Sequence, residues 1–199
     1  MLERITGIVL DKALRGESGV LFAVFSAELG LCRLYKRVSQ KKTVQLPDFF
    51  DAISAEAEKS KTGGMYFLRD FENIASHPRI AEDYGAFSDA SEIAKCALKN
   101  AAYLERFAEM HALLQAAFAA INSGANSACV RVKFMYVFAR GEGYPIKEDF
   151  AASLNAQEFS LLKKILNTPA AELGAEVEGA RELLEKMMSW IAANTDIAG

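Results

Sequence analysis

The feature that most constrains the fold is a change of hydrophobic period near residue 75. Before it, apolar residues alternate with polar ones in short runs, which is the period of β-strands. From about residue 79, apolar residues recur every three or four positions, which is the period of helices. The chain of 199 residues is therefore predicted to be an α+β protein with a strand-rich part, residues 1–75, and a mainly helical part, residues 76–199.

Five runs in the first part are typical of strands, because they are rich in β-branched and aromatic residues or alternate strictly. They span residues 4–12, 18–26, 31–38, 51–58 and 65–71. Short turn sequences separate them, except for a longer polar loop between the third and the fourth. This order predicts a five-stranded OB-fold barrel, and an SH3-like barrel fits the pattern nearly as well.

The second run is apolar on both of its faces. Val20, Phe22 and Val24 alternate along it with Leu21, Ala23 and Phe25. A strand of this kind must be covered on both sides. We therefore expect another part of the chain to pack against the outside of the barrel.

Helix signals follow in the second part. Asp89 and Glu92 have the spacing of a capping box, which predicts that a helix begins at Asp89. Asn155 and Glu158 repeat that spacing ahead of another helix. The last helix is expected from about Glu176.

Charge is unevenly distributed along the chain. The first part carries 11 Lys and Arg against 10 Asp and Glu, and the second part carries 12 against 16. Within the first part, residues 30–47 contain five basic residues and no acid. A basic segment of this kind attracts polyanions.

Arg33, Tyr35 and Arg37 fall on one face of the third strand at two-residue spacing. A row of basic, aromatic and basic side chains suits a single strand of nucleic acid, with phosphates on the guanidinium groups and a base on the ring. The predicted nucleic-acid-binding residues are Arg33, Tyr35, Lys36, Arg37, Lys41 and Lys42, with Phe67 as a second candidate for stacking. The alternative is a solvated loop that protects an edge strand, together with an ordinary half-buried tyrosine.

The sequence shows no catalytic or metal-binding pattern. Residues 16–19 are one residue short of a nucleophile elbow and lie between two strands, so we expect a hairpin turn there. Adjacent carboxylates such as Glu82 and Asp83 suit helix caps better than an acid–base pair. The three scattered cysteines and two histidines lack the spacing of zinc ligands. We therefore predict a binding protein without cofactor or metal, not an enzyme, and hold a hydrolase to be the weakest alternative.

No segment is predicted to cross a membrane. The longest near-apolar stretch, residues 112–121, is shorter than the roughly 18 residues that a membrane span needs. The first residues also lack the basic and apolar pattern of a secretory signal. The expected location is cytoplasmic, and a membrane partner is not expected.

Several short motifs, taken in order, resemble the bacterial recombination mediator family RecO. They are TGIVL at residues 6–10, GES at 16–18, LFAVFSAELG at 21–30, the basic YKRVSQKK at 35–42, FMYVF at 134–138, GYP at 143–145 and the stretch 162–169. The family's glycine in the basic segment is absent here. Residues 145–153 also leave no room for the zinc-binding cysteines that many members carry.

This resemblance implies an N-terminal OB domain and a helical C-terminal domain. It also implies binding to single-stranded and double-stranded DNA, strand annealing, and loading of the RecA recombinase in DNA repair. The implied partners are RecR and single-strand binding protein. An alternative from another class is an adapter whose helical domain docks the acidic, aromatic-ended tail of single-strand binding protein without significant DNA binding.

Overall fold

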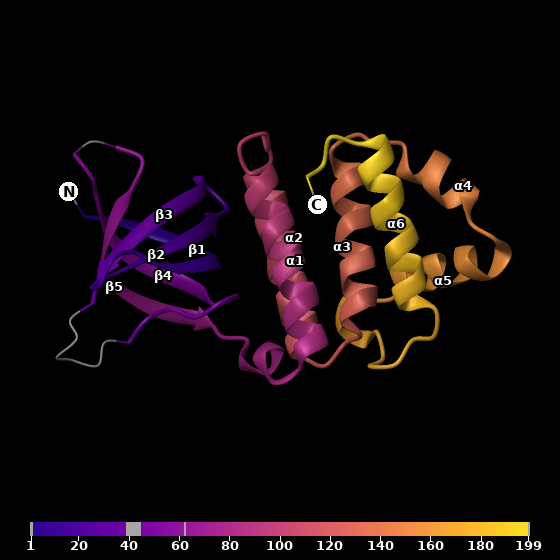
Figure 1. Ribbon diagram of the computed structural model, residues 1–199, viewed down its shortest axis with the longest axis horizontal. Helices are drawn as coiled ribbons and strands as arrows, with labels where there is room; N and C mark the ends of the chain where they lie inside the picture. The colour runs from indigo at the N-terminus through magenta and orange to yellow at the C-terminus, as the bar shows by residue number, and fades with distance from the viewer. Residues whose placement is uncertain (1, 39–44, 62, 199) are drawn as a thin grey trace. The chain divides into compact units, whose positions relative to one another are not determined.

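The computed structural model describes residues 2–38, 45–61 and 63–198 and shows an α+β protein, as the change of period predicts (Figure 1). Five strands come first and are followed by helices. Their bounds are β1 Leu2–Leu14, β2 Gly19–Ser26, β3 Gly30–Arg37, β4 Ala52–Lys59 and β5 Tyr66–Ala75. Each predicted strand is present within a few residues of its expected ends.

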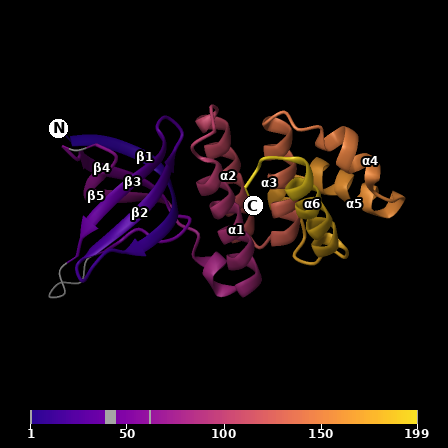
Figure 2. The ribbon, with the colours of Figure 1, turned by 45° about the horizontal axis from the view of Figure 1, so that its top comes forward.

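The strand pairings form a closed ring in the order β1, β2, β3, β5, β4, and β4 returns to β1. All neighbours are antiparallel except β3 and β5, which run parallel where Leu34 and Tyr35 lie opposite Tyr66 and Phe67. The turn between β1 and β2 is the predicted hairpin, closed by the Arg15 amide donating to the Gly19 carbonyl. Figure 2 shows β2 and β3 side by side as the pairing requires.

The apolar core of the strands lies inside the ring. It combines alternate residues of all five strands: Ile5, Val9, Val20, Phe22, Val24, Cys32, Leu34, Ile53, Ala55, Ala57 and Leu68. On the outside of β2, the buried ring of Phe25 meets the Phe107 ring edge to face, with centroids 6.2 Å apart. The β2–β3 turn allows this contact, because a Cβ atom on Gly30 would lie 2.9 Å from the Phe107 ring. The expected outer cover of β2 is therefore partly present.

The helical part has α-helices, short 3₁₀ turns and one π-helical turn. The α-helices are α1 Tyr84–Asn100, α2 Phe107–Asn122, α3 Ser127–Gly141, α4 Ala151–Ser153, α5 Ala156–Asn167 and α6 Ala180–Asn194. Helix α3 contacts α1, α5 and α6. Its Lys133 ammonium donates to the carbonyls of Ile165, Leu166 and Thr168 at the end of α5.

One helix start is predicted correctly and two are not. Asn155 and Glu158 form the expected capping box of α5. Helix α1, however, begins at Tyr84, and its first turn is capped by Asp83, whose Oδ1 accepts the Ala86 amide at 2.6 Å. Asp89 lies inside this helix, so its predicted role as a cap is wrong. Helix α6 begins at Ala180, after Gly179 in the left-handed region, and not near Glu176.

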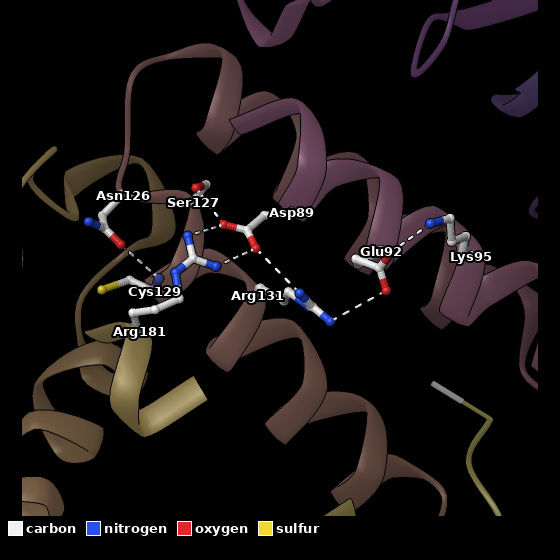
Figure 3. Close-up of polar contacts among 8 residues, drawn as sticks. All are labelled: Asp89, Glu92, Lys95, Asn126, Ser127, Cys129, Arg131 and Arg181. Atoms are coloured by element: carbon white, nitrogen blue, oxygen red, sulfur yellow. Dashed lines mark hydrogen bonds and ion pairs between the residues drawn. The ribbon is translucent and has the colours of Figure 1, made fainter. Parts of the chain in front are cut away.

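Asp89 instead connects three helices of the second part through charged hydrogen bonds (Figure 3). Its carboxylate is 1% exposed and receives both terminal nitrogens of Arg181 from α6, at 2.8 and 2.9 Å. Ser127 donates to it at 2.7 Å and Arg131 lies 3.4 Å away, both from α3. Arg131 also contacts Glu92, one turn along α1 from Asp89. We call these five residues the Asp89 cluster.

The surroundings of Asp89 set its protonation state. Burial alone would raise the pKa of this carboxyl group, because it disfavours the charged form. The hydrogen bonds from Arg181 and Ser127, with the charges of Arg181 and Arg131, outweigh burial and hold the pKa below its ordinary value. Asp89 is therefore an ionised, hydrogen-bonded group inside the helical part.

By its contacts the chain divides into two compact units. The strand unit comprises residues 1–77 and 101–115, and the helical unit comprises residues 78–100 and 116–199. The segment that carries Phe107 thus belongs to the strand unit. Among the described residues, no helix is long and apolar enough to cross a membrane.

Candidate nucleic-acid interface

The predicted basic and aromatic row lies on the outside of β3. Cys32 and Leu34 point into the core of the ring, so the residues that alternate with them face outward. Arg33 and Arg37 are exposed, and Tyr35 is half-buried. The local alternation of the sequence is thus sufficient to bring these three side chains to one face.

Pairing between β3 and β5 brings a second ring to Tyr35. Phe67 lies opposite Tyr35 in the parallel pair, and the two rings meet edge to face with centroids 6.1 Å apart and planes at 87°. Tyr35 also covers Gly19 of β2, where an added Cβ atom would lie 2.4 Å from the Tyr35 hydroxyl. Because the rings are nearly perpendicular, a base stacked on one ring meets the other with its edge.

These rings belong to a surface groove of about 780 Å³ at the ends of β3 and β5. Its walls are Ser18, Tyr35, Lys36, Arg37, Phe67, Leu68 and Arg69. The groove therefore combines two aromatic rings with three cationic side chains. We refer to it below as the β3–β5 groove.

An irregularity in β5 positions two of the cations. Leu68 lies opposite Ala57 and Asp70 lies opposite Glu56, so Arg69 between them has no partner in the β4–β5 ladder. The Lys36 ammonium donates to the carbonyl of Arg69. The Arg69 guanidinium is hydrogen-bonded to the exposed Glu58 carboxylate, which lowers the pKa of Glu58. The hydrogen bond from Lys36 to the bulged residue thus joins Lys36 and Arg69 at one wall of the groove.

Only part of the predicted residue set comes together here. Tyr35, Lys36 and Arg37 line the groove, whereas Arg33 lies farther along β3 and does not. Lys41 and Lys42 fall outside the described residues. Arg69 was not predicted, because it is a single basic residue followed by Asp70 and Glu72 in the sequence. It comes beside β3 only through the β3–β5 pairing.

Acidic side chains lie on a neighbouring face of the strand unit. The outer residues of β4 and β5 include the exposed acids Glu56, Asp70 and Glu72 and the half-buried Glu58. Arg4 pairs with Glu56, as Arg69 does with Glu58. A polyanion would therefore be attracted along β3 and repelled from the outer face of β4.

No metal site is evident near the groove. Within residues 2–38, 45–61 and 63–198, no group of three His, Cys, Asp or Glu side chains is placed to hold a metal ion. All three cysteines are buried thiols. Burial raises the pKa of Cys96 to about 12 and that of Cys129 to about 11, so both are protonated near neutral pH.

Neither a protein-family model nor a curated protein sequence matches this chain.

Proposed function

We propose that the protein binds single-stranded DNA in the β3–β5 groove. The observation that carries the proposal is the pair of aromatic rings, Tyr35 and Phe67, flanked by Lys36, Arg37 and Arg69 in one open groove. Proteins that bind single strands combine rings on which bases stack with cations that contact the phosphates. A groove of this composition serves both needs and reads no base sequence.

We further infer that the ring of strands is a barrel of the OB type. The closed strand order and the parallel contact between β3 and β5 support this inference. OB folds bind oligonucleotides beside strands 2 and 3 and the loops that join strands 1–2 and 4–5. The groove lies at such a place, since Ser18 precedes β2 and Phe67 follows the β4–β5 connection.

The motif order that resembles RecO extends the proposal to a role. We propose that the protein acts in the cytoplasm as a recombination mediator that assists strand annealing and recombinase loading during DNA repair. RecR and single-strand binding protein are its proposed partners, and duplex DNA is a further ligand. The adapter alternative has weaker support, because the surface hollow of the helical unit described below carries acidic side chains, which would repel an acidic tail.

The proposal is tested by titrating a fluorescent single-stranded oligonucleotide at several salt concentrations and measuring anisotropy. Each phosphate neutralised on a single strand contributes roughly −0.7 to the slope of log affinity against log salt, so three contacts predict about −2. Replacing Lys36, Arg37 and Arg69 together by alanine should weaken binding and flatten that slope. A matched variant that removes Arg4, Lys95 and Arg106, three exposed cations outside the groove, should keep the slope.

Stacking is tested separately from charge. Tyr35→Ala and Phe67→Ala should each weaken binding by about 1–3 kcal/mol wherever a base stacks, and leave the salt slope unchanged. Gly19→Ala should displace the Tyr35 ring and reproduce the loss seen for Tyr35→Ala. If the unaltered protein shows no binding at low salt, where attraction is strongest, the proposed function is wrong.

A further inference from the structure

The helical unit contains a second surface feature, a hollow of about 480 Å³ beside α6. It is lined by Phe150, Ser153, Leu154, Glu182, Glu185, Lys186, Ser189 and Trp190. Phe150 ends the π-helical turn before α4, Ser153 ends α4 and Leu154 follows it. The other five residues lie on α6. We call it the α6 hollow.

The base of the α6 hollow is apolar. Phe150 is 1% exposed, and its ring centroid lies 6.0 Å from that of Trp190. Leu154 and Trp190 are half-buried and thus partly open to solvent. An apolar side chain that entered from outside would contact two aromatic rings and a leucine. Removing its apolar surface from water in this way favours binding.

The rim of the hollow is acidic. Glu182 and Glu185 are exposed and share one face of α6 at a spacing of three residues. Within the described part of the chain, neither carboxylate forms a salt bridge. Lys186 also lines the hollow, but its ammonium is bound to the Glu158 carboxylate, and the neighbouring Arg181 is bound to Asp89. Both cations thus form their hydrogen bonds with other carboxylates, and the Arg181 charge only acts on Glu185 from a distance. The two rim carboxylates remain open to hydrogen bonds from an incoming cation.

We propose that the α6 hollow docks a cationic segment of a partner protein, with an apolar side chain on the aromatic base and Lys or Arg side chains on Glu182 and Glu185. Charge complementarity selects this occupant, since an acidic peptide or a nucleic acid would be repelled by the same carboxylates. The inference does not rest on DNA binding, because it uses a different unit of the chain and a ligand of opposite charge.

The chain offers a built-in reporter for this site, because Trp190 is its only tryptophan. The full-length protein is titrated at low salt with a short synthetic peptide of alternating Lys and Leu, and with the same peptide carrying Glu in place of Lys. Only the Lys peptide should change the emission of Trp190, and added salt should weaken that change. Equal responses to both peptides, or no response to the Lys peptide, would overturn the proposal.

Two double variants test whether binding depends on the rim carboxylates or only on the net charge of the protein. Glu182→Gln with Glu185→Gln should weaken binding of the Lys peptide by about three- to tenfold, as expected for the loss of two exposed ion pairs. Glu176→Gln with Glu178→Gln removes the same charge from exposed positions outside the hollow and should leave the affinity unchanged. Equal weakening by the two double variants would show that only net charge matters and would overturn the assignment of the site.

Discussion

The strand unit and the helical unit place their charged pairs differently. In the strand unit, Arg4 with Glu56 and Arg69 with Glu58 are ion pairs between exposed side chains. In the helical unit, Asp89 is almost fully buried and is held by cations from two other helices. The helical unit thus has a buried ion-paired carboxylate in addition to surface pairs such as Lys186 with Glu158.

The difference follows from where the backbone N–H and C=O groups of each unit find their hydrogen-bond partners. Neighbouring strands exchange backbone hydrogen bonds, so the ladders themselves fix the register of the ring. Helices satisfy their backbone internally, and only side chains can fix how α1, α3 and α6 align. A buried carboxylate with several charged donors is costly unless all of them are in place, so it specifies one arrangement of the helices. The following predictions test this contrast.

The largest loss of stability is expected for Asp89→Asn. The neutral amide cannot form ion pairs with Arg131 and Arg181, and it leaves Arg131 with one anionic partner fewer in a largely buried position. Removing one partner of a buried pair should cost about 3 kcal/mol of unfolding free energy. Urea unfolding followed by the fluorescence of Trp190 in α6 measures the loss in the helical unit. A loss no larger than that of the surface variant Glu58→Gln would contradict the contrast.

Acid should weaken the helical unit through the same group. The pKa of Asp89 is lower in the folded state than the value of about 3.9 in an unfolded chain. Its contribution is therefore fully present above about pH 4 and is lost as the pH falls through the folded pKa, because the unfolded state binds the proton more readily there. Asp89→Asn should show a shallower loss of stability below pH ~4 than the unaltered protein. Parallel urea titrations at several acidic pH values check this.

A smaller effect is expected at the end of α5. Lys133 donates to three carbonyls there, so Lys133→Met keeps much of the apolar stem but removes the donors. We expect a loss of about 2 kcal/mol, typical of hydrogen bonds that involve a charged group. Lys163→Met, an exposed lysine on α5 that lies over the Phe159 ring, is the matched control and should cost less. Similar losses in the two variants would argue against the capping role.

The smallest effect is expected for Glu58→Gln in the strand unit. This change breaks the ion pair with Arg69, but both side chains are exposed and screened by solvent. The thermal midpoint of the strand signal in circular dichroism should not change measurably. In the DNA titration the same variant should strengthen binding, because it frees the Arg69 guanidinium and removes a nearby negative charge. Weaker DNA binding by this variant would contradict the place of Arg69 in the interface.

Local patterns predicted the elements well. The five strands follow from alternation within single runs, and the α5 capping box follows from Asn155 and Glu158. The start of α1 was missed because its true cap, Asp83, is followed three residues later by Ala86 and so lacks the second half of the pattern. Asp89 and Glu92 have the spacing of a capping box only by chance, since both lie inside α1.

Contacts between distant segments were not predictable in the same way. Tyr35 was expected on the outer face of its strand, but nothing near it in the sequence indicates that β5 lies alongside. Arg69 lines the groove only because β5 pairs with β3. Likewise, the Asp89 cluster joins residues 42 and 92 positions apart in sequence, a separation over which hydrophobic period carries no information.

The contact between Phe25 and Phe107 makes the strand unit discontinuous in the gene. Its outer cover is encoded after α1, so residues 78–100 form an insertion within the unit that they interrupt. A gene fragment that stops at residue 77 would encode all five strands without Phe107, and would leave an aromatic face of β2 open to other chains. Dissection or transplantation of the strand unit therefore needs residues 101–115 rejoined to it, by a linker that replaces α1.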